Sequence, residues 1–159
     1  MIKNLKNFNI LILSLCSIIL VIVYYLEYFL NLEPCSLCLY QRIPYFVAIF
    51  LSLLLLVIKN NKISKFLFYF LITVFFISLL LASYHFGIEN NFWDSFISCE
   101  NNTELKSENL KDYLLKKEYI SCKNTTFSLF GVSLAGYNII ISLFLFIFSL
   151  KMKKKNLRL

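Results

Sequence analysis

The sequence predicts an all-α membrane protein, a bundle of four transmembrane helices with one longer extramembrane loop. Two observations support this fold class. Of the 159 residues, 59% are apolar and the mean hydropathy is +0.72, whereas soluble domains are roughly 45–50% apolar. Four separate stretches also approach the length of about 20 apolar residues that a helix needs to cross a bilayer. We therefore expect a single membrane domain that includes residues 1–159.

The four apolar stretches cover residues 8–26, 40–58, 66–83 and 127–150. The first follows Lys3 and Lys6, as a secretory signal core would. However, its apolar run exceeds the roughly 7–15 residues of a signal core, and no Ala-x-Ala-like cleavage site follows it. We expect it to be a retained helix. The second stretch follows a short link that carries two cysteines, and the third and fourth flank the long polar segment.

Charge predicts the orientation of these helices. Ten cationic residues and no acidic one lie before the first stretch, between the second and third, and after the fourth. They are Lys3, Lys6, Lys59, Lys62, Lys65, Lys151, Lys153, Lys154, Lys155 and Arg158. Such segments are cytoplasmic by the positive-inside rule, so both termini should be cytoplasmic. The net charge of +7 then reflects topology and contact with anionic lipid, and does not indicate nucleic-acid binding.

Residues 84–126 form the one long segment predicted to lie outside the bilayer, on the non-cytoplasmic side. Its stretch 104–120 has apolar residues at three- and four-residue offsets, which predicts a short helix in the membrane interface. These residues are Leu105, Leu110, Tyr113, Leu114 and Ile120. Ahead of it, the stretch 90–93 ends in Phe92 and Trp93, which we expect to act as an aromatic anchor.

Four of the five cysteines lie outside the predicted spans and on the non-cytoplasmic side, where disulfides form and persist. Cys35 and Cys38 are a Cys-x-x-Cys pair at the expected start of the second helix. The helix dipole and free backbone amides there favour the thiolate form, which is the nucleophile. Arg42 follows Cys38 by one helical turn and adds a positive charge.

A structural disulfide and half of a zinc site are the alternatives for this pair. Zinc fits less well because Cys99 and Cys122 are too far apart in sequence to form a second tight pair, and the chain has one histidine. We therefore predict no metal.

Two thiol pairs on one side fit a thiol–disulfide relay. A soluble dithiol would reduce a Cys99–Cys122 disulfide, and Cys35–Cys38 would pass the electrons to an acceptor dissolved in the bilayer, such as a lipid quinone.

Other polar residues have simpler interpretations. His85 fits an interfacial position in the headgroup region, and Arg42 could extend from a helix end toward water. Tyr40 and Tyr45 fit either a pocket wall or interfacial anchors. Cys16, within the first stretch, is expected to be a small buried residue.

The motif Pro34-Cys35-Ser36-Leu37-Cys38-Leu39-Tyr40-Gln41-Arg42 resembles that of the disulfide bond formation protein B (DsbB) family of bacterial inner-membrane thiol oxidases. The resemblance extends over nearly the whole chain. It includes Tyr84-His85 after the third stretch, the loop that carries Cys99 and Cys122, and Phe130-Gly131-Val132 before the fourth stretch. One departure is Gln41, which stands where the best-known members carry an acidic residue; another is the short, Lys-rich loop.

The resemblance implies a role for each cysteine. Cys99 would form the mixed disulfide with a periplasmic thioredoxin-fold protein of the DsbA type, and Cys122 would exchange with Cys35. Cys38 would engage ubiquinone or menaquinone. Arg42 would assist there, and His85 matches a family position near the quinone.

Two rival functions remain open. One is a specialised or vitamin-K-epoxide-reductase-like enzyme that uses similar thiols on another substrate, although its relatives usually place the tight pair next to a late span. The other is a non-enzymatic membrane scaffold whose loop is held by two structural disulfides, which would have lower reduction potentials than relay disulfides.

Overall fold

The computed structural model describes residues 2–32, 34–58, 60–93, 128–129 and 131–157, with the backbone alone for 2–5, 128–129 and 153–157. It contains the helices α1 (Ile2–Phe29), α2 (Ser36–Val57), α3 (Asn61–Glu89) and α5 (Leu134–Leu157). A minimal antiparallel pair of strands, β1 (Ser128–Leu129) and β2 (Val132–Ser133), precedes α5. Each of the four helices is long and apolar enough to cross a membrane. The predicted all-α four-helix membrane fold is confirmed.

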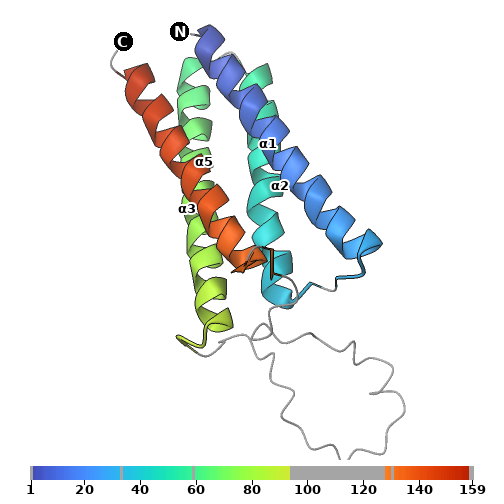
Figure 1. Cartoon of the computed structure of the whole chain (residues 1–159). Coiled ribbons are helices and arrows are strands. Elements are labelled where there is room, and N and C mark those ends of the chain that lie inside the picture. Colours follow the sequence, from blue (N-terminus) through green and yellow to red (C-terminus); the bar gives the residue numbers. More distant parts are fainter. Residues whose placement is uncertain (1, 33, 59, 94–127, 130, 158–159) are drawn as a thin grey trace, which may run out of the picture.

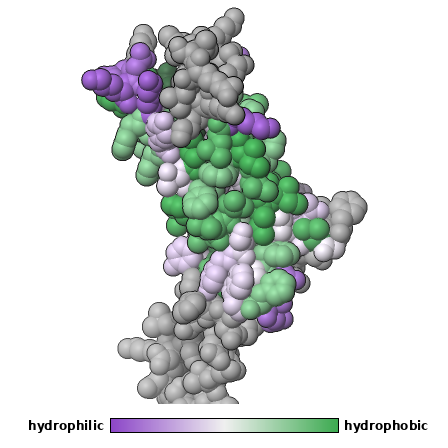
Figure 2. All heavy atoms as spheres, turned by 90° about the vertical axis from the view of Figure 1, so that its left-hand side faces the viewer, coloured by the Kyte–Doolittle hydropathy of each residue, from purple (hydrophilic) through white to green (hydrophobic). Residues whose placement is uncertain are grey.

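The helices pack in chain order, α1 on α2, α2 on α3, and α3 on α5 (Figure 1). The first turn of α1 and the last turn of α5 lie at one end of the bundle, and α2 begins with the cysteine motif at the opposite end (Figure 1). On the face shown in Figure 2, apolar side chains form a band between more polar ends. This distribution suits a bundle surrounded by lipid.

Helix boundaries differ from the apolar stretches at two places that matter for the site. α3 continues from the expected end near residue 83 to Glu89, so His85 lies within the helix. α5 begins at Leu134, although the apolar stretch begins near residue 127. Ser133 caps α5, because its Oγ accepts a hydrogen bond of 3.2 Å from the Gly136 backbone N–H.

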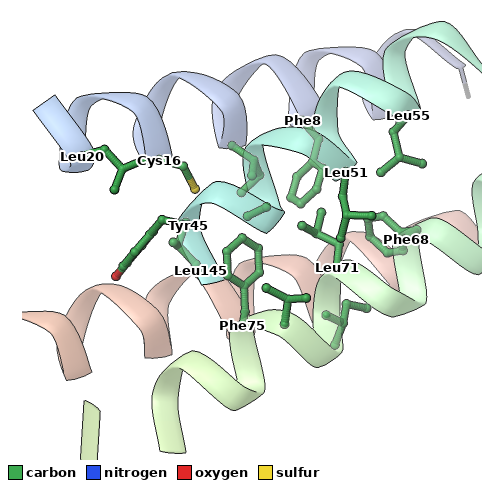
Figure 3. Close-up of a cluster of buried hydrophobic side chains, with 14 residues drawn as sticks. Phe8, Cys16, Leu20, Tyr45, Leu51, Leu55, Phe68, Leu71, Phe75 and Leu145 are labelled. Carbon is green, nitrogen blue, oxygen red and sulfur yellow. The ribbon is translucent and has the colours of Figure 1, made fainter. Parts of the chain in front are cut away.

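The main apolar core fills the part of the bundle remote from the cysteine motif. Its fully buried members include Ile12, Leu71 and Phe75, and the Phe8 ring packs edge-on against Phe68 (Figure 3). Cys16 belongs to this core and is fully buried (Figure 3), as expected for a packing residue.

The predicted interfacial helix at residues 104–120, together with Cys99 and Cys122, lies outside the described residues. Trp93 lies within them. Its indole stacks on the Tyr84 ring and donates a hydrogen bond of 3.1 Å to the Tyr84 carbonyl. The indole packs so closely over Gly87 that a Cβ on this residue would lie 2.0 Å from it. Trp93 is thus packed back against the end of α3.

Candidate active site

The Cys-x-x-Cys pair forms the first turn of α2. Cys35 is the N-cap in extended conformation (φ −69°, ψ 167°), and its Sγ accepts a hydrogen bond of 3.4 Å from the Cys38 backbone N–H. The sulfur atoms of Cys35 and Cys38 are 3.1 Å apart. A helix N-terminus stabilises negative charge, so the local fold favours a thiolate at this position.

His85 of α3 packs against Cys35. Its Nε2 lies 3.5 Å from Cys35 Sγ and 3.6 Å from a carboxylate oxygen of Glu89, one turn further along α3. The imidazole is 2% exposed. One ligand atom each from Cys35, Cys38 and His85 lies within 4.8 Å of the others, so the three side chains could approach a common atom.

A row of polar side chains continues from His85 into the bundle. Gln41 Nε2 lies 3.0 Å from His85 Nδ1, and Asn138 Nδ2 donates a hydrogen bond of 2.9 Å to Gln41 Oε1. Tyr45 donates a hydrogen bond from its hydroxyl to Asn138 Oδ1. These residues come from α2, α3 and α5, so the row ties three helices together in the half of the bundle near the cysteines.

Arg42 is held by two residues of α1. Its guanidinium donates a hydrogen bond of 2.6 Å to Glu27 and lies 5.0 Å from the centre of the Tyr24 ring, within the range of a cation–π interaction. The guanidinium Nε is buried and has no hydrogen-bond partner among the described residues. A buried donor of this kind is unusual in native structures, and an acceptor on a ligand would satisfy it.

A cavity of about 440 Å³ lies between α1, α2 and α5, beside the cysteine motif. Its walls are mostly aliphatic, with a few polar groups around Cys38. The lining residues are Ile19, Leu20, Ile22, Val23, Leu26, Glu27, Leu32, Pro34, Cys38, Gln41, Arg42, Tyr45, Leu134, Ala135, Tyr137, Asn138 and Ile141. An apolar cavity with few polar groups is the usual form of a small-molecule site.

The structure brings four predicted site residues to one end of the bundle: Cys35, Cys38, Arg42 and His85. Only Cys38 and Arg42 line the cavity, whereas His85 contacts the other cysteine. The sequence left open whether Tyr40 and Tyr45 line a pocket or act as interfacial anchors, and their positions in the structure differ. Tyr45 is buried in the cavity wall, and Tyr40 is 50% exposed.

Sequence reasoning missed Glu27 and Asn138 as parts of this site. Glu27 is a single carboxylate at the end of an apolar run, and such a charge near a membrane needs a partner. Asn138 and Ser142 are four residues apart in an otherwise apolar stretch, which places two polar groups on one helix face. These patterns could have indicated both residues, but not the partners they contact.

Comparisons with known proteins agree with the cysteine motif and the four-helix fold. Residues 5–152 match the family model described as "Disulfide bond formation protein DsbB". The chain is 26% identical over 147 residues to "Uncharacterized protein RP370" of Rickettsia prowazekii (strain Madrid E), an alignment that covers 90% of this chain and 84% of that protein. No solved structure gives a significant match. The family match covers nearly the whole chain, including every residue of the candidate site described above. On this basis the chain belongs to the DsbB family of disulfide bond formation proteins.

Proposed function

We propose that this protein is a quinone-dependent thiol oxidase that reoxidises a periplasmic thioredoxin-fold dithiol protein of the DsbA type. Ubiquinone or menaquinone would be the acceptor. Membership of the DsbB family supports a membrane protein of disulfide bond formation, and the proposal adds the donor, the acceptor and the order of the cysteines.

The observation that carries the proposal is the apolar cavity that meets Cys38 and Arg42. Its aliphatic walls fit a quinone ring and the start of a prenyl tail. Carbonyl oxygens on such a ring accept hydrogen bonds, and the buried Arg42 Nε has no other acceptor among the described residues. Cys38 is one of the residues that line the cavity, so a quinone bound there would lie beside it.

The cysteines would then act in sequence. A reduced donor reduces the Cys99–Cys122 disulfide. The Cys122 thiolate attacks the Cys35 sulfur, so that a Cys122–Cys35 bond forms and Cys38 leaves with the electron pair as a thiolate. Cys99 next attacks Cys122, which restores the first disulfide and releases the Cys35 thiolate. A quinone bound in the cavity supplies the sink, because it takes up two electrons and two protons when the Cys35–Cys38 disulfide returns.

The proposed orientation places the cysteine end of the bundle on the periplasmic side of the bacterial inner membrane. The support is the excess of lysine at the opposite end, where α1 begins and α5 ends. In this orientation the donor reaches the thiols from water and the acceptor reaches Cys38 from lipid.

A cavity-filling variant tests the acceptor site. Val23 lines the cavity, and Val21 on the same helix is 67% exposed and does not. In an anaerobic assay with a reduced thioredoxin-fold donor and a short-chain quinone, we expect Val23→Trp to raise the KM for quinone about tenfold or more. Val21→Trp, the same change outside the cavity, should behave as wild type.

Substitution of the cysteines tests the chemistry itself. Loss of quinone absorbance in wild type, abolished in Cys38→Ser and in Cys99→Ser, would support the relay. If wild type leaves the quinone unchanged while its own thiols stay oxidised, the protein is a disulfide-stapled scaffold and the proposal fails. Equal quinone kinetics in Val23→Trp and Val21→Trp would show that the acceptor binds elsewhere.

A further inference from the structure

The hydrogen bonds around Gln41 determine which nitrogen of His85 carries a proton. Gln41 belongs to α2, and its side chain contacts α3 and α5. The residue is 8% exposed, so water contributes little to its contacts. Its two amide atoms therefore depend on protein partners, and the chemistry of those partners decides which atom is the donor.

The Leu81 carbonyl sets the orientation of the Gln41 amide, and the contact with Asn138 agrees with it. The Leu81 backbone carbonyl, which can only accept, lies 3.4 Å from Gln41 Nε2. On the other side, Asn138 donates its Nδ2–H to Gln41 Oε1. The Tyr45 hydroxyl donates to Asn138 Oδ1 in this arrangement. Reversing the Gln41 amide would put two acceptors together at Leu81 and two donors together at Asn138.

This orientation leaves one role for His85 Nδ1. The Gln41 amino group lies 3.0 Å from Nδ1, so Nδ1 must be the acceptor of that hydrogen bond. A neutral imidazole has one donor and one acceptor nitrogen. The proton of a neutral His85 is therefore on Nε2, which faces Cys35 Sγ at 3.5 Å and the Glu89 carboxylate at 3.6 Å, both of them acceptors.

We propose that Gln41 is a positioning residue, which holds neutral His85 with its proton on Nε2 so that this N–H donates to the Cys35 sulfur. The Cys35 thiolate then receives hydrogen bonds from His85 and from the Cys38 backbone N–H, two partners within the described part of the chain. Hydrogen bonds to an ion are stronger than those between neutral groups. The assignment of the proton stands on geometry, and its consequence for thiol oxidation rests on the proposed function.

The assignment separates two roles that His85 could otherwise have. With its lone pair on Nε2, the imidazole would accept the thiol proton of Cys35 or bind a metal ion together with the two sulfurs. With the proton on Nε2, neutral His85 offers no lone pair in that direction and acts as a donor. The polar row that begins at Tyr45 thus favours a stabilised thiolate over a zinc site.

The single histidine of the chain makes a direct test possible. Reduced protein labelled with ¹⁵N-histidine and held in detergent micelles gives signals from one imidazole alone. A long-range ¹H–¹⁵N correlation spectrum at neutral pH distinguishes Nε2–H, Nδ1–H and the doubly protonated ring. We expect neutral His85 with Nε2–H, and either of the other two forms would overturn the proposal.

Gln41→Glu tests the cause of this tautomer. An ionised carboxylate cannot donate to Nδ1, so at a pH where the introduced side chain is ionised we expect the proton to move to Nδ1 or the ring to become doubly protonated. Asn91→Asp adds the same charge on an exposed residue just after α3, and its spectrum should match wild type. If Gln41→Glu keeps a neutral ring with Nε2–H at a pH where the introduced carboxyl is ionised, Gln41 does not set the tautomer.

A second variant acts without touching the histidine. Asp at position 138 cannot donate to Gln41 Oε1, so Asn138→Asp should turn the Gln41 amide and shift the His85 proton in the same direction. An unchanged spectrum in a folded Asn138→Asp protein would also count against the proposal. These spectra require neither donor nor quinone, so they remain informative if the proposed function fails.

The redox equilibrium of the Cys35–Cys38 pair provides the functional readout. Loss of a hydrogen bond to the thiolate should shift the equilibrium with dithiothreitol about tenfold toward the disulfide, or about 30 mV toward a lower potential. We expect this shift in Gln41→Glu relative to Asn91→Asp, which carries the same added charge. Equal potentials in the two variants would show that the His85 proton does not act on Cys35.

Discussion

The two sulfur atoms of the cysteine motif are 3.1 Å apart, yet their surroundings differ. Cys38 lines an apolar cavity of about 440 Å³ between α1, α2 and α5. Cys35 is 4% exposed and faces the imidazole of His85, which is backed by a row of hydrogen-bonded side chains. One helical turn therefore separates an environment suited to an apolar molecule from one suited to a stabilised anion.

In the proposed function one Cys-x-x-Cys pair serves two reaction partners, and this difference suits both. An apolar acceptor needs a dry surface with few hydrogen-bonding groups, whereas a thiolate that leaves and attacks repeatedly needs donors around its sulfur. The start of α2 supplies both, because Cys38 borders the cavity between α1, α2 and α5 while Cys35 contacts His85 of α3. The following predictions test this division, in order of decreasing effect.

The largest expected effect is a difference in labelling. In reduced proteins that retain one cysteine each, either Cys35 or Cys38, N-phenylmaleimide in a detergent micelle should label Cys38 on the order of a hundredfold faster, because Cys35 reacts only after local opening. Mass spectrometry of quenched samples measures both rates. Equal rates in the folded proteins would contradict the distinction between the two sulfurs.

Substitution of Arg42 should affect the binding of quinone in the cavity and leave the exchange with the donor unchanged. Arg42→Met removes a charged donor from the cavity, so we expect the KM for a short-chain quinone to rise about tenfold. The rate at which a reduced donor exchanges with the protein in the absence of quinone should stay unchanged.

Two further variants control for this substitution. Glu27→Gln combined with Arg42→Met avoids an unpaired carboxylate on α1, and Lys62→Met removes an exposed charge from the start of α3. A change in donor exchange that persists in the double variant would show that Arg42 serves both sides of the pair.

The smallest expected effect is on stability, from the loss of one hydrogen bond at Tyr45, a residue that borders both environments. Tyr45→Phe removes the hydroxyl that donates to Asn138 and should lower the free energy of unfolding by about 1 kcal/mol. Tyr40→Phe makes the same change on a half-exposed ring and should stay within about 0.5 kcal/mol of wild type. Unfolding in mixed micelles with increasing dodecyl sulfate measures both, and equal losses would remove Tyr45 from the polar row.

The fold was predictable from sequence because membrane helices depend on the length of apolar runs. The extension of α3 to Glu89 was not predicted, since Tyr84 and His85 end the apolar run. The helix continues beyond them because its polar groups find partners: Glu89 accepts a hydrogen bond from Ser133, and His85 is enclosed by Cys35 and Gln41.

The candidate site was predictable in part. Cys35, Cys38 and Arg42 lie close together in sequence, so local spacing identified them. The partners of His85 and Arg42 could not be identified in this way, because Gln41 is 44 residues from His85 and Glu27 belongs to another helix. Such contacts depend on which helix faces meet, and a hydropathy pattern does not contain this information.

The contacts of Ser133 connect the end of α3 with the start of α5. Its hydroxyl donates to Glu89 at the end of α3 while it caps the first turn of α5, so the chain leaves and re-enters the bundle at adjoining positions. For a loop with fixed and adjoining ends, each doubling of length costs only about 0.6 kcal/mol of closure entropy. We therefore expect changes in the number of residues between Glu89 and Ser133 to have little effect on the stability of the helices.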